Sequence, residues 1–526
     1  MKKIPSSIFN DVIGPIMRGP SSSHVAGGAR IAGLVRQSFQ SPLKKVICDF
    51  DPTGALAASH TGHGTDMGFA CGLIGIPLEN PDVDQYDKLA KERGLDIEYR
   101  ILEYGATHPG NYRIKAIAED DSIHEWEAIS VGGGMIEMQK FDGFHVKICG
   151  DFYELLVVVD LNKCILECIE EELAKRLPEN EFLLEDTVGE KGIINWKLAC
   201  PLEKNMIDEL RVLPGVLDIV YLTPILPTHS SAHCDVPYLN ARELLAYANE
   251  HPMQAWQYAT LYESIRGNMS EQEVLAKMEE ILAVMEQAVD QGLKGTTYEN
   301  RILGPQAYKI GEKEAQGGLV PCEPLNAIIK SITAVMEVKS SMGLIVAAPT
   351  VGSCGCIPGT VIGLGRTLNL SREEMVKGLM VGGLIGVFVS EAATFSAEVA
   401  GCQVECGAAS GMAAAAVTQM MGGTIEQCVK AASMALQNIT GLACDPVGNR
   451  VEVPCLGKNV MGGSNAVASA NMILAGYDAV IPLDETILAI YEIGLSLPLE
   501  LRCTFGGLGK TKTALGIYEK MEKHYR

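Results

Sequence analysis

The pattern of hydrophobic and polar positions divides the 526-residue chain into three regions. Over residues 1–150, short apolar runs that alternate with polar positions predict strands, as in VICDF, RIKAIAED and WEAISVGGG. Between them the spacing predicts helices from Val25 to Val35 and from Thr65 onward. The first region is therefore expected to be an α+β domain.

Residues 151–226 form a smaller unit with a different pattern of apolar and polar positions. LLVVVD, INWKLAC and LDIVYLTPI are typical of strands, whereas CILECIEEELAKRL and MIDELRVLPGV carry the apolar period of helices. The order β-α-β-(β)-α-β predicts a ferredoxin-like module of the kind that senses small molecules. The stretch that follows is rich in proline, serine and histidine, which predicts a linker over residues 227–240.

From residue 241 to residue 526 strands nearly vanish, and the apolar residues recur with the 3.6-residue period of helices. A glycine-rich break is expected from Ala348 to Gly359, and Ser371 with Glu374 predicts a capping box that begins a helix. The apolar run GLMVGGLIGVFV has roughly 12 residues, fewer than the about 20 that span a bilayer, so it is predicted to be a core helix. The C-terminal region is expected to be all-α.

Composition and charge narrow the class of protein. Hydrophobic residues make up 47% of the chain and the formal net charge is −22, which argues for a globular protein and against nucleic-acid binding. The N-terminus carries two lysines without an apolar segment after them, so no secretory signal is expected and a cytoplasmic location without a membrane partner is predicted. In a reducing compartment, sixteen cysteines indicate metal or cluster binding, or plain burial, instead of a disulfide framework.

Three cysteines form the main candidate for chemistry. Cys402, Cys444 and Cys455 lie 42 residues (402 to 444) and 11 residues (444 to 455) apart, and the last two stand close to prolines on irregular backbone. A [4Fe–4S] cluster that serves electron transfer uses four thiolates, so three thiolates would leave one iron open as a Lewis acid. Zinc sites usually pair their ligands at shorter spacing. Buried free thiols are the alternative, and Cys406, Cys354 or Cys356 could supply a fourth thiolate.

Two polar segments of the first region could hold or activate a ligand. Ser21, Ser22 and Ser23 precede the first predicted helix, where hydroxyls and free amides suit a carboxylate or phosphate, although an ordinary helix cap has the same pattern. His60 and His63, followed by Asp66, could be metal ligands or a general base with its orienting acid, or surface residues of a glycine-flanked loop.

Several long motifs resemble one family in the same order along nearly the whole chain. GPSSSH, ASHTGHGTD and SVGGG resemble the β part, and APTxGSxGxIPG, GCQxExGxASGMAAAA, GLxCDPVxxxVEVPC and NxMGxSNA resemble the α part, of the iron–sulfur-dependent L-serine dehydratases. The chain resembles the form in which both parts are fused, and residues 151–226 resemble the ACT domain that some members carry between them.

The resemblance implies conversion of L-serine to pyruvate and ammonia, a step in amino-acid catabolism and gluconeogenesis, by a protein that is usually a homodimer. It implies a [4Fe–4S] cluster on Cys402, Cys444 and Cys455, whose open iron acts on the substrate hydroxyl. Of the three histidines that could act as the base, His63 is the first choice, and His60 and His24 are the alternatives. The substrate is expected to be anchored by hydroxyls, namely those of Ser21, Ser22, Ser23 and Thr65.

The chain departs from the family pattern at several positions that bear on the substrate. The departures are Val25, Val351, Cys354, Cys356, Arg450, Cys503 and Phe505. Arg450 places a cation between two cluster ligands, where it could bind a second carboxylate. The last five residues contain no cysteine, so the plug that closes the open iron in some members is not expected.

Three alternatives stay open at this point. One is the same chemistry on another small β-substituted amino acid, including removal of sulfide from cysteine. Another is a non-catalytic cluster or ACT-type sensor whose extra cysteines close the fourth site. A pyridoxal-phosphate dehydratase is a further rival in activity, against which stands the lack of a lysine in a convincing cofactor loop.

Overall fold

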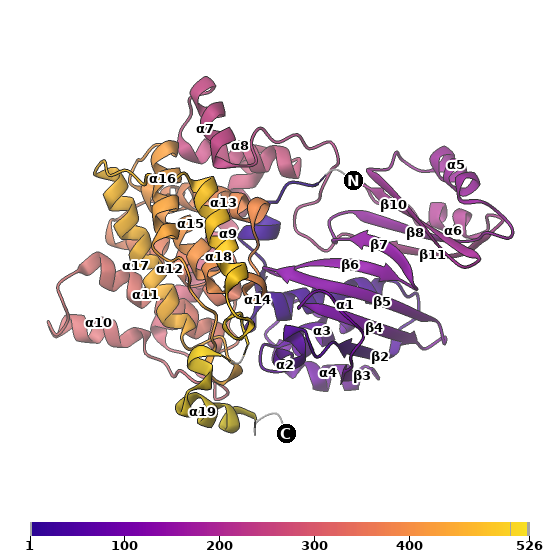
Figure 1. The fold of residues 1–526 in the computed structure, drawn as a ribbon, viewed down its shortest axis with the longest axis horizontal. Helices are drawn as coiled ribbons and strands as arrows, with labels where there is room; N and C mark the ends of the chain where they lie inside the picture. The colour runs from indigo at the N-terminus through magenta and orange to yellow at the C-terminus, as the bar shows by residue number, and fades with distance from the viewer. Residues whose placement is uncertain (1–2, 505, 523–526) are drawn as a thin grey trace.

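A computed structural model describes residues 3–504 and 506–522 of the chain. The α+β regions lie on one side of the molecule and the helices of the C-terminal half on the other (Figure 1). The expected class, an α+β N-terminal region followed by an all-helical C-terminal region, is confirmed.

The first region is built on a six-stranded sheet of order β3-β2-β4-β5-β6-β7. Its strands, in that order, are Asp96–Ile101, Leu43–Phe50, Asn111–Ala118, Ile123–Gly132, Met135–Phe141 and Phe144–Ile148. Burial alternates along β4 and β5, as expected for strands with one face on a core. Helices α1 (Gly27–Gln37) and α3 (Thr65–Ile74) pack against each other beside this sheet, together with the shorter α2 (Ala55–Ser59) and α4 (Tyr86–Glu92).

The first helix begins later than the sequence indicated. A π-helical turn, Ser22–Ala26, precedes α1, so the helix expected from Val25 starts at Gly27. The side chain of Ser21 does not cap this turn, because its hydroxyl bonds to the ring of His24 instead. The hydroxyls of Ser21 and Ser23 therefore point toward a histidine and not toward the helix end.

The second region has the element order that the sequence predicted. β8 (Tyr153–Asp160), α5 (Leu166–Arg176), β9 (Phe182–Val188), β10 (Lys191–Leu198), α6 (Lys204–Arg211) and β11 (Val216–Leu222) form an antiparallel sheet of order β11-β8-β10-β9. Alternate residues of β8 point to opposite faces: Leu155 and Val157 face a core shared with α5 and α6, whereas Leu156 and Val158 join the core of the six-stranded sheet. Its identity as an ACT domain remains a prediction.

Thirteen helices are described after residue 240, with a core around α13 and α15. They are α7 (Ala241–Glu250), α8 (Ala255–Gly267), α9 (Glu271–Lys294), α10 (Ala307–Ala315), α11 (Glu323–Ser340), α12 (Cys356–Thr367), α13 (Arg372–Ala392), α14 (Ala397–Ala400), α15 (Cys406–Met420), α16 (Ile425–Gln437), α17 (Cys455–Leu474), α18 (Leu483–Ser496) and α19 (Lys512–Glu522). The glycine-rich break is shorter than expected, because α12 already begins at Cys356. The capping box of Ser371 and Glu374 is confirmed at the start of α13.

Helix α13 differs in length from its prediction. It has 21 residues and is, among the described residues, the one helix long and apolar enough by length and composition to cross a membrane. The expectation of a segment too short to span was wrong because flanking residues extend the helix beyond the apolar run. Since 78% of its most apolar 18-residue window is buried inside the protein, α13 is nevertheless a core helix.

The N-terminal segment ties the two sides of the molecule together. The turn Ile8–Val12 packs on α13, where a Cβ at Gly386 would lie 2.1 Å from Val12 Cγ1. Strand β1 (Ile16–Met17) then pairs with β12 (Ile345–Val346), just before the Ala348–Gly355 loop. This pairing brings the serine loop at residues 20–23 beside the glycine-rich loop of the helical region.

Candidate active site

The three predicted ligand cysteines are buried at the ends of helices and in the loops between them. Cys402 lies in a 3₁₀ turn before α15, Cys444 in the loop between α16 and α17, and Cys455 is the first residue of α17. The ligand atoms of Cys402, Cys444 and Glu405 lie within 4.8 Å of one another. Cys455 is close enough that the charges of Cys402 and Glu405 contribute to raising its pKa to about 12, a shift caused mainly by burial.

Two further thiols join this group, and two do not. The thiol of Cys406 is in hydrogen-bond contact with Cys402, and that of Cys503 with Cys444. The contact of Cys503 follows from a backbone bridge in which Cys503 N donates to Cys444 O at 2.9 Å. Cys354 and Cys356 belong, like Cys455, to the main hydrophobic core, whereas Cys406 and Cys503 cluster with Cys402 and Cys444. Of the candidates for a fourth thiolate, Cys406 is therefore the one that the fold brings to the site.

Polar side chains surround the cysteines. Hydrogen bonds from Cys406 and Cys444, and secondarily the charge of Lys458, hold the pKa of Cys402 well below its ordinary value. Lys458 Nζ donates to Asp445 Oδ1 at 2.8 Å and to Ala443 O at 2.6 Å. Thiolates are the form that binds iron, so a nearby ammonium suits a site for a metal cluster.

Asn459 joins three segments of the site. Its amide donates to Gly352 O and to Cys455 O, both at 2.8 Å, and lies 3.7 Å from Cys406 Sγ. Its Oδ1 accepts from the backbone N–H of Cys356 at 2.9 Å. The side chain thus fixes the starts of α12, α15 and α17 relative to one another.

Next to the cysteines, two histidines of the first region are buried against each other. The rings of His24 and His63 meet edge to face, with centroids 4.6 Å apart. His24 Nε2 lies 2.7 Å from Ser59 Oγ, and its Nδ1 lies 3.0 Å from Ser21 Oγ and 3.2 Å from Ser23 Oγ. Burial lowers the pKa of His24 to about 3, with a smaller contribution from His60. His24 is accordingly neutral and held in place at both ring nitrogens.

His63 differs from His24 in having no fixed partner. Both of its ring nitrogens are buried, and neither has a hydrogen-bond partner among the described residues. Burial, followed by the neighbouring His24, holds its pKa well below the ordinary value. A neutral imidazole with an unbound ring nitrogen is able to accept a proton, so the site presents a base.

Sequence reasoning missed Glu398, which lies between the histidines and the cysteines. Its Oε1 accepts from Ser23 Oγ at 3.3 Å and lies 3.9 Å from His24 Nδ1, while its Oε2 accepts from Ser396 Oγ at 2.8 Å. The charge of Glu398 also contributes to raising the pKa of Glu405, after burial and Cys402. The one signal in the sequence was a pair of acids flanking Cys402, at positions 398 and 405.

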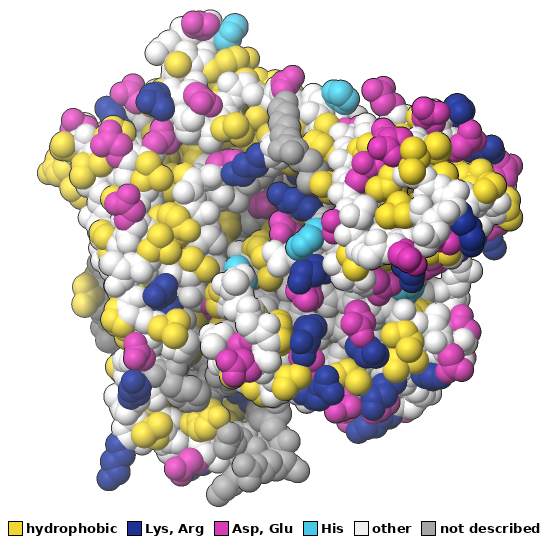
Figure 2. Space-filling model, turned by 45° about the vertical axis from the view of Figure 1, so that its right-hand side comes forward, with side chains coloured by type: hydrophobic (Ala, Val, Ile, Leu, Met, Phe, Trp, Pro, Cys, Tyr) yellow, Lys and Arg dark blue, Asp and Glu magenta, His cyan; other side chains and the backbone are white. Residues whose placement is uncertain are grey.

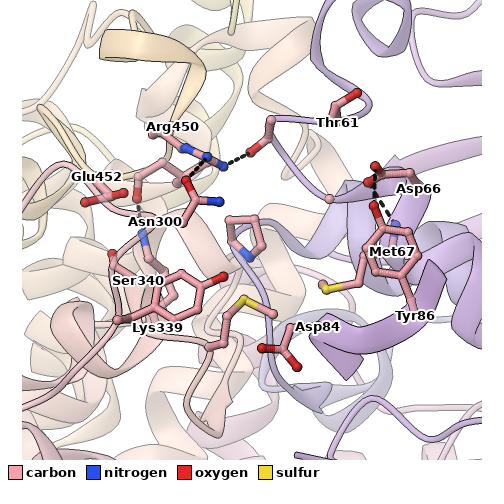
Figure 3. A pocket seen from close by; sticks show the side chains of 16 residues that line it. Thr61, Asp66, Met67, Asp84, Tyr86, Asn300, Lys339, Ser340, Arg450 and Glu452 are labelled. Atoms are coloured by element: carbon pink, nitrogen blue, oxygen red, sulfur yellow. Dashed lines mark hydrogen bonds between the residues drawn. The ribbon is translucent and has the colours of Figure 1, made fainter. Parts of the chain in front are cut away.

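Close backbone contacts join the loop that carries His60 and His63 to the segment between Cys444 and Cys455. A Cβ at Gly62 would lie 2.5 Å from Asn449 Nδ2 and 2.7 Å from Asn449 O, so only glycine fits without movement. Arg450 donates to Gly62 O at 3.2 Å and to Asn300 Oδ1 at 2.7 Å, as Figure 3 shows. Arg450 therefore links the loop that contains Gly62 to Asn300 of the helical region. Nearby, Ser22 Oγ accepts from Val351 N at 3.2 Å, which joins the serine loop to the helical region.

A cavity of about 160 Å³ lies outside this loop, between the first region and the helical region (Figure 3). Arg450 and Lys339 supply cations to its wall, and the ammonium of Lys339 is bound to Val451 O. Asp66 lines the opposite side and accepts from Tyr86 Oη at 2.8 Å. The role of Asp66 as the orienting acid of a histidine stays a prediction, since its carboxylate accepts a hydrogen bond from Tyr86 of α4 and the charge of His60 also acts on it.

The remaining predicted residues lie around these features. The ring of His60 packs against Phe50 and Tyr99 in the first region. Thr65 is buried at the start of α3, and its Oγ1 has no hydrogen-bond partner among the described residues. Val25 is fully buried against Gly19 and Gly64. Phe505 and the last four residues of the chain, on which the absence of a plug was predicted, lie outside the described residues.

The fold and the site together define a two-part protein in which an α+β region covers a helical region with a cysteine cluster. Residues 241–508 match the family described as serine dehydratase alpha chain, and the chain belongs to this family. It is 39% identical to the probable L-serine dehydratase alpha chain of Bacillus subtilis (strain 168), over 54% of this chain and 95% of that protein.

Other relatives account for the N-terminal half. The probable L-serine dehydratase beta chain of Bacillus subtilis is 31% identical over 40% of this chain and 96% of its own length. The L-serine dehydratase of Helicobacter pylori (strain ATCC 700392 / 26695) is 26% identical over 94% of this chain and 96% of its own length. The chain is thus similar to two separate proteins joined end to end, and to a single-chain relative over almost its whole length.

Proposed function

We propose that this protein is an L-serine dehydratase, which converts L-serine to pyruvate and ammonia. The observation that carries the proposal is the close packing of Gly62 on Asn449, which holds the loop of His63, with its unbonded imidazole, on the segment between Cys444 and Cys455. Relatives of both halves bear the name L-serine dehydratase.

Cys402, Cys444 and Cys455 are proposed to hold a [4Fe–4S] cluster. The donor set fits such a group, because the thiols are buried, lie beside an ammonium at Lys458, and have a separate carboxylate, Glu405, within reach. A cubane held by three thiolates would supply one open iron as a Lewis acid for the hydroxyl and carboxylate of serine.

Residues of the chain itself bind the substrate and accept the proton from its Cα. A ring nitrogen of His63 takes the proton from the substrate Cα, and His24 fixes the ring of His63 by edge-to-face contact. Glu398, with Ser21 and Ser23 beside it, is placed to receive the substrate ammonium. Loss of the β-hydroxyl then gives aminoacrylate, which tautomerises and hydrolyses to pyruvate and ammonia.

Burial makes these interactions effective. His63 and His24 are buried and Glu405 is half-buried, so a fixed charge acts more strongly here than at the surface. The low pKa of His63 keeps the imidazole in its neutral form at physiological pH, as a base requires.

The decisive experiment is an assay of anaerobically purified enzyme for pyruvate formed from L-serine. His63→Gln should lower kcat by about 10² to 10⁴-fold, because general-base catalysis contributes about that factor. Its iron and sulfide contents should match those of the unmodified protein. His145→Gln, which changes an exposed histidine on β7, is the matched control and should keep full activity. Wild-type rates from His63→Gln would remove His63 from this role.

Electron paramagnetic resonance separates catalysis from a closed site. Addition of L-serine should shift or broaden the cluster signal, since substrate would reach an open iron. An unchanged signal would indicate four thiolates, with Cys406 as the fourth, and would favour the sensor alternative.

Two cations near the site bear on the choice of substrate. Arg450 and Lys339 line the same cavity, an arrangement that could also serve a substrate with a second carboxylate. The assay should therefore include L-threonine, L-cysteine and a β-hydroxylated dicarboxylic amino acid beside L-serine. A higher kcat/KM for any of these would replace serine as the proposed substrate. A homodimer in the cytoplasm is the expected form, and size-exclusion chromatography with light scattering measures the assembly.

A further inference from the structure

A second cavity, of about 320 Å³, lies where all three regions of the chain meet. Its walls come from the N-terminal segment, strands β6 and β7, the region of residues 151–226, and helix α8. In Figure 2 the surface is hollowed between the helical region and the α+β regions, and charged side chains of both signs gather around the hollow. None of the residues that line this cavity lines the cavity at Arg450.

One wall carries a buried carboxylate with no direct partner. Asp151 is 8% exposed, and its carboxylate makes no hydrogen bond or ion pair among the described residues. Its backbone O accepts from Ser230 N at 3.1 Å, which fixes the residue just before β8. The charge of Lys197 reaches this carboxylate without a direct contact. Burial of a carboxylate is costly unless a cation or donors contact it, so a positively charged ligand group would stabilise this wall further.

The other polar walls carry cations that are more than nine-tenths buried. Lys197 Nζ donates to Glu154 Oε1 and to Lys147 O, both at 2.6 Å, and these bonds use two of its three donors. Arg266 donates to His229 O at 3.0 Å and to Ser230 Oγ at 2.9 Å, which are neutral acceptors. The described residues give Arg266 no direct ion pair, but its charge lowers the pKa of Glu263 and of Asp11, both of which burial raises, so an anionic ligand group would share this cation with two acids.

An apolar surface completes the cavity. The rings of Phe152 and Phe182 meet edge to face with centroids 5.7 Å apart, and Leu226 lies on the same lining. A carboxylate, buried cations and an aromatic wall thus share a cavity of the size that small ligands occupy. A ligand that satisfies all three must carry an ammonium, a carboxylate and an apolar group.

We propose that this cavity binds a free α-amino acid with an apolar side chain. Its ammonium pairs with Asp151, its carboxylate faces Lys197 and Arg266, and its side chain packs on the pair of phenylalanines. Because the walls belong to three regions, the bound amino acid fixes the region of residues 151–226 against α8 and the N-terminal segment. The N-terminal segment continues into the turn that packs on α13, so the site is built to couple ligand binding to the helical region.

Isothermal titration calorimetry and thermal unfolding of the full-length holoprotein test this proposal. L-Valine, L-leucine and L-phenylalanine are titrated separately, with L-serine and inorganic phosphate as comparators. At least one of the three apolar amino acids should bind and raise Tm, while phosphate should not. Asp151→Asn should weaken that binding at least about tenfold, because it removes the partner of the ammonium.

Matched variants separate this site from the active site. Asp160→Asn changes an acid at the other end of β8 and should leave binding unchanged, and His63→Gln should leave it unchanged as well. Phe182→Ala should weaken binding of L-phenylalanine without removing a charge, which keeps the test informative if Asp151→Asn folds poorly. The proposal is overturned if no apolar amino acid binds, if phosphate binds equally well, or if binding persists in Asp151→Asn and is lost in His63→Gln.

Discussion

Replacing Gly62 by alanine is expected to separate the histidine loop from the cysteine segment. The added Cβ would lie 2.5 Å from Asn449 Nδ2 and 2.7 Å from Asn449 O, against 3.4–4 Å for ordinary contact. The loop that carries His63 must therefore move by about 1 Å. A misplacement of that size costs about 10²-fold in rate, and overpacking costs about 1–3 kcal/mol of stability.

The assay is kcat/KM for pyruvate formation, with thermal unfolding measured in parallel. Gly33→Ala is the control, since a Cβ at Gly33 in α1 meets no heavy atom within 4 Å and alanine favours a helix by about 1 kcal/mol. Asn449→Gly removes the nearest atom but leaves the backbone oxygen, so the double variant Gly62→Ala/Asn449→Gly should recover part of the lost activity. Unchanged kcat/KM in Gly62→Ala would refute the idea that this contact positions His63.

Three further predictions concern charges in and beside the site. Glu398→Gln should lower kcat/KM for L-serine about tenfold or more while iron content stays constant, because it removes the charge that faces the ammonium. The pKa of His24 is about 3 in the folded chain and about 6.5 when unfolded, so the unfolded chain binds more protons between these values. Stability is therefore lost as pH falls below about 6.5, by about 2 kcal/mol from this group at pH 5, and His24→Gln should show a smaller fall of Tm between pH 7.5 and 5. Lys197→Met should cost about 3–5 kcal/mol in thermal unfolding, because it leaves the buried Glu154 without its cation.

Controls for these predictions come from exposed groups. Lys163→Met breaks a largely exposed pair with Asp160 and should cost less than about 1 kcal/mol. Equal losses from Lys163→Met and Lys197→Met would contradict the argument from burial. If the Tm of His24→Gln equals that of the unmodified protein at every pH, the prediction for His24 is contradicted. Full activity in Glu398→Gln would contradict the prediction for Glu398.

The sequence predicted the order of helices and strands well, because hydrophobic periodicity is a local property of the chain. It failed where local signals compete with tertiary contacts. Ser21 matches the pattern of a helix cap, yet its hydroxyl bonds to the ring of His24. The element order of residues 151–226 followed from periodicity, whereas the packing of that sheet on the first one did not.

By itself, the sequence determined the two-part organisation, the family motifs and the set of cysteines that could bind a cluster. Tertiary structure decided which thiols cluster: Cys406 lies with Cys402 and Cys444, whereas Cys354 and Cys356 belong to the main core together with Cys455. It also distinguished His63, buried with unbonded nitrogens, from His60, and brought Glu398 to within 3.9 Å of His24. The physical reason is that the sequence fixes the residue types and their separation along the chain. The direction of a side chain depends instead on the helix ends and loops packed around it.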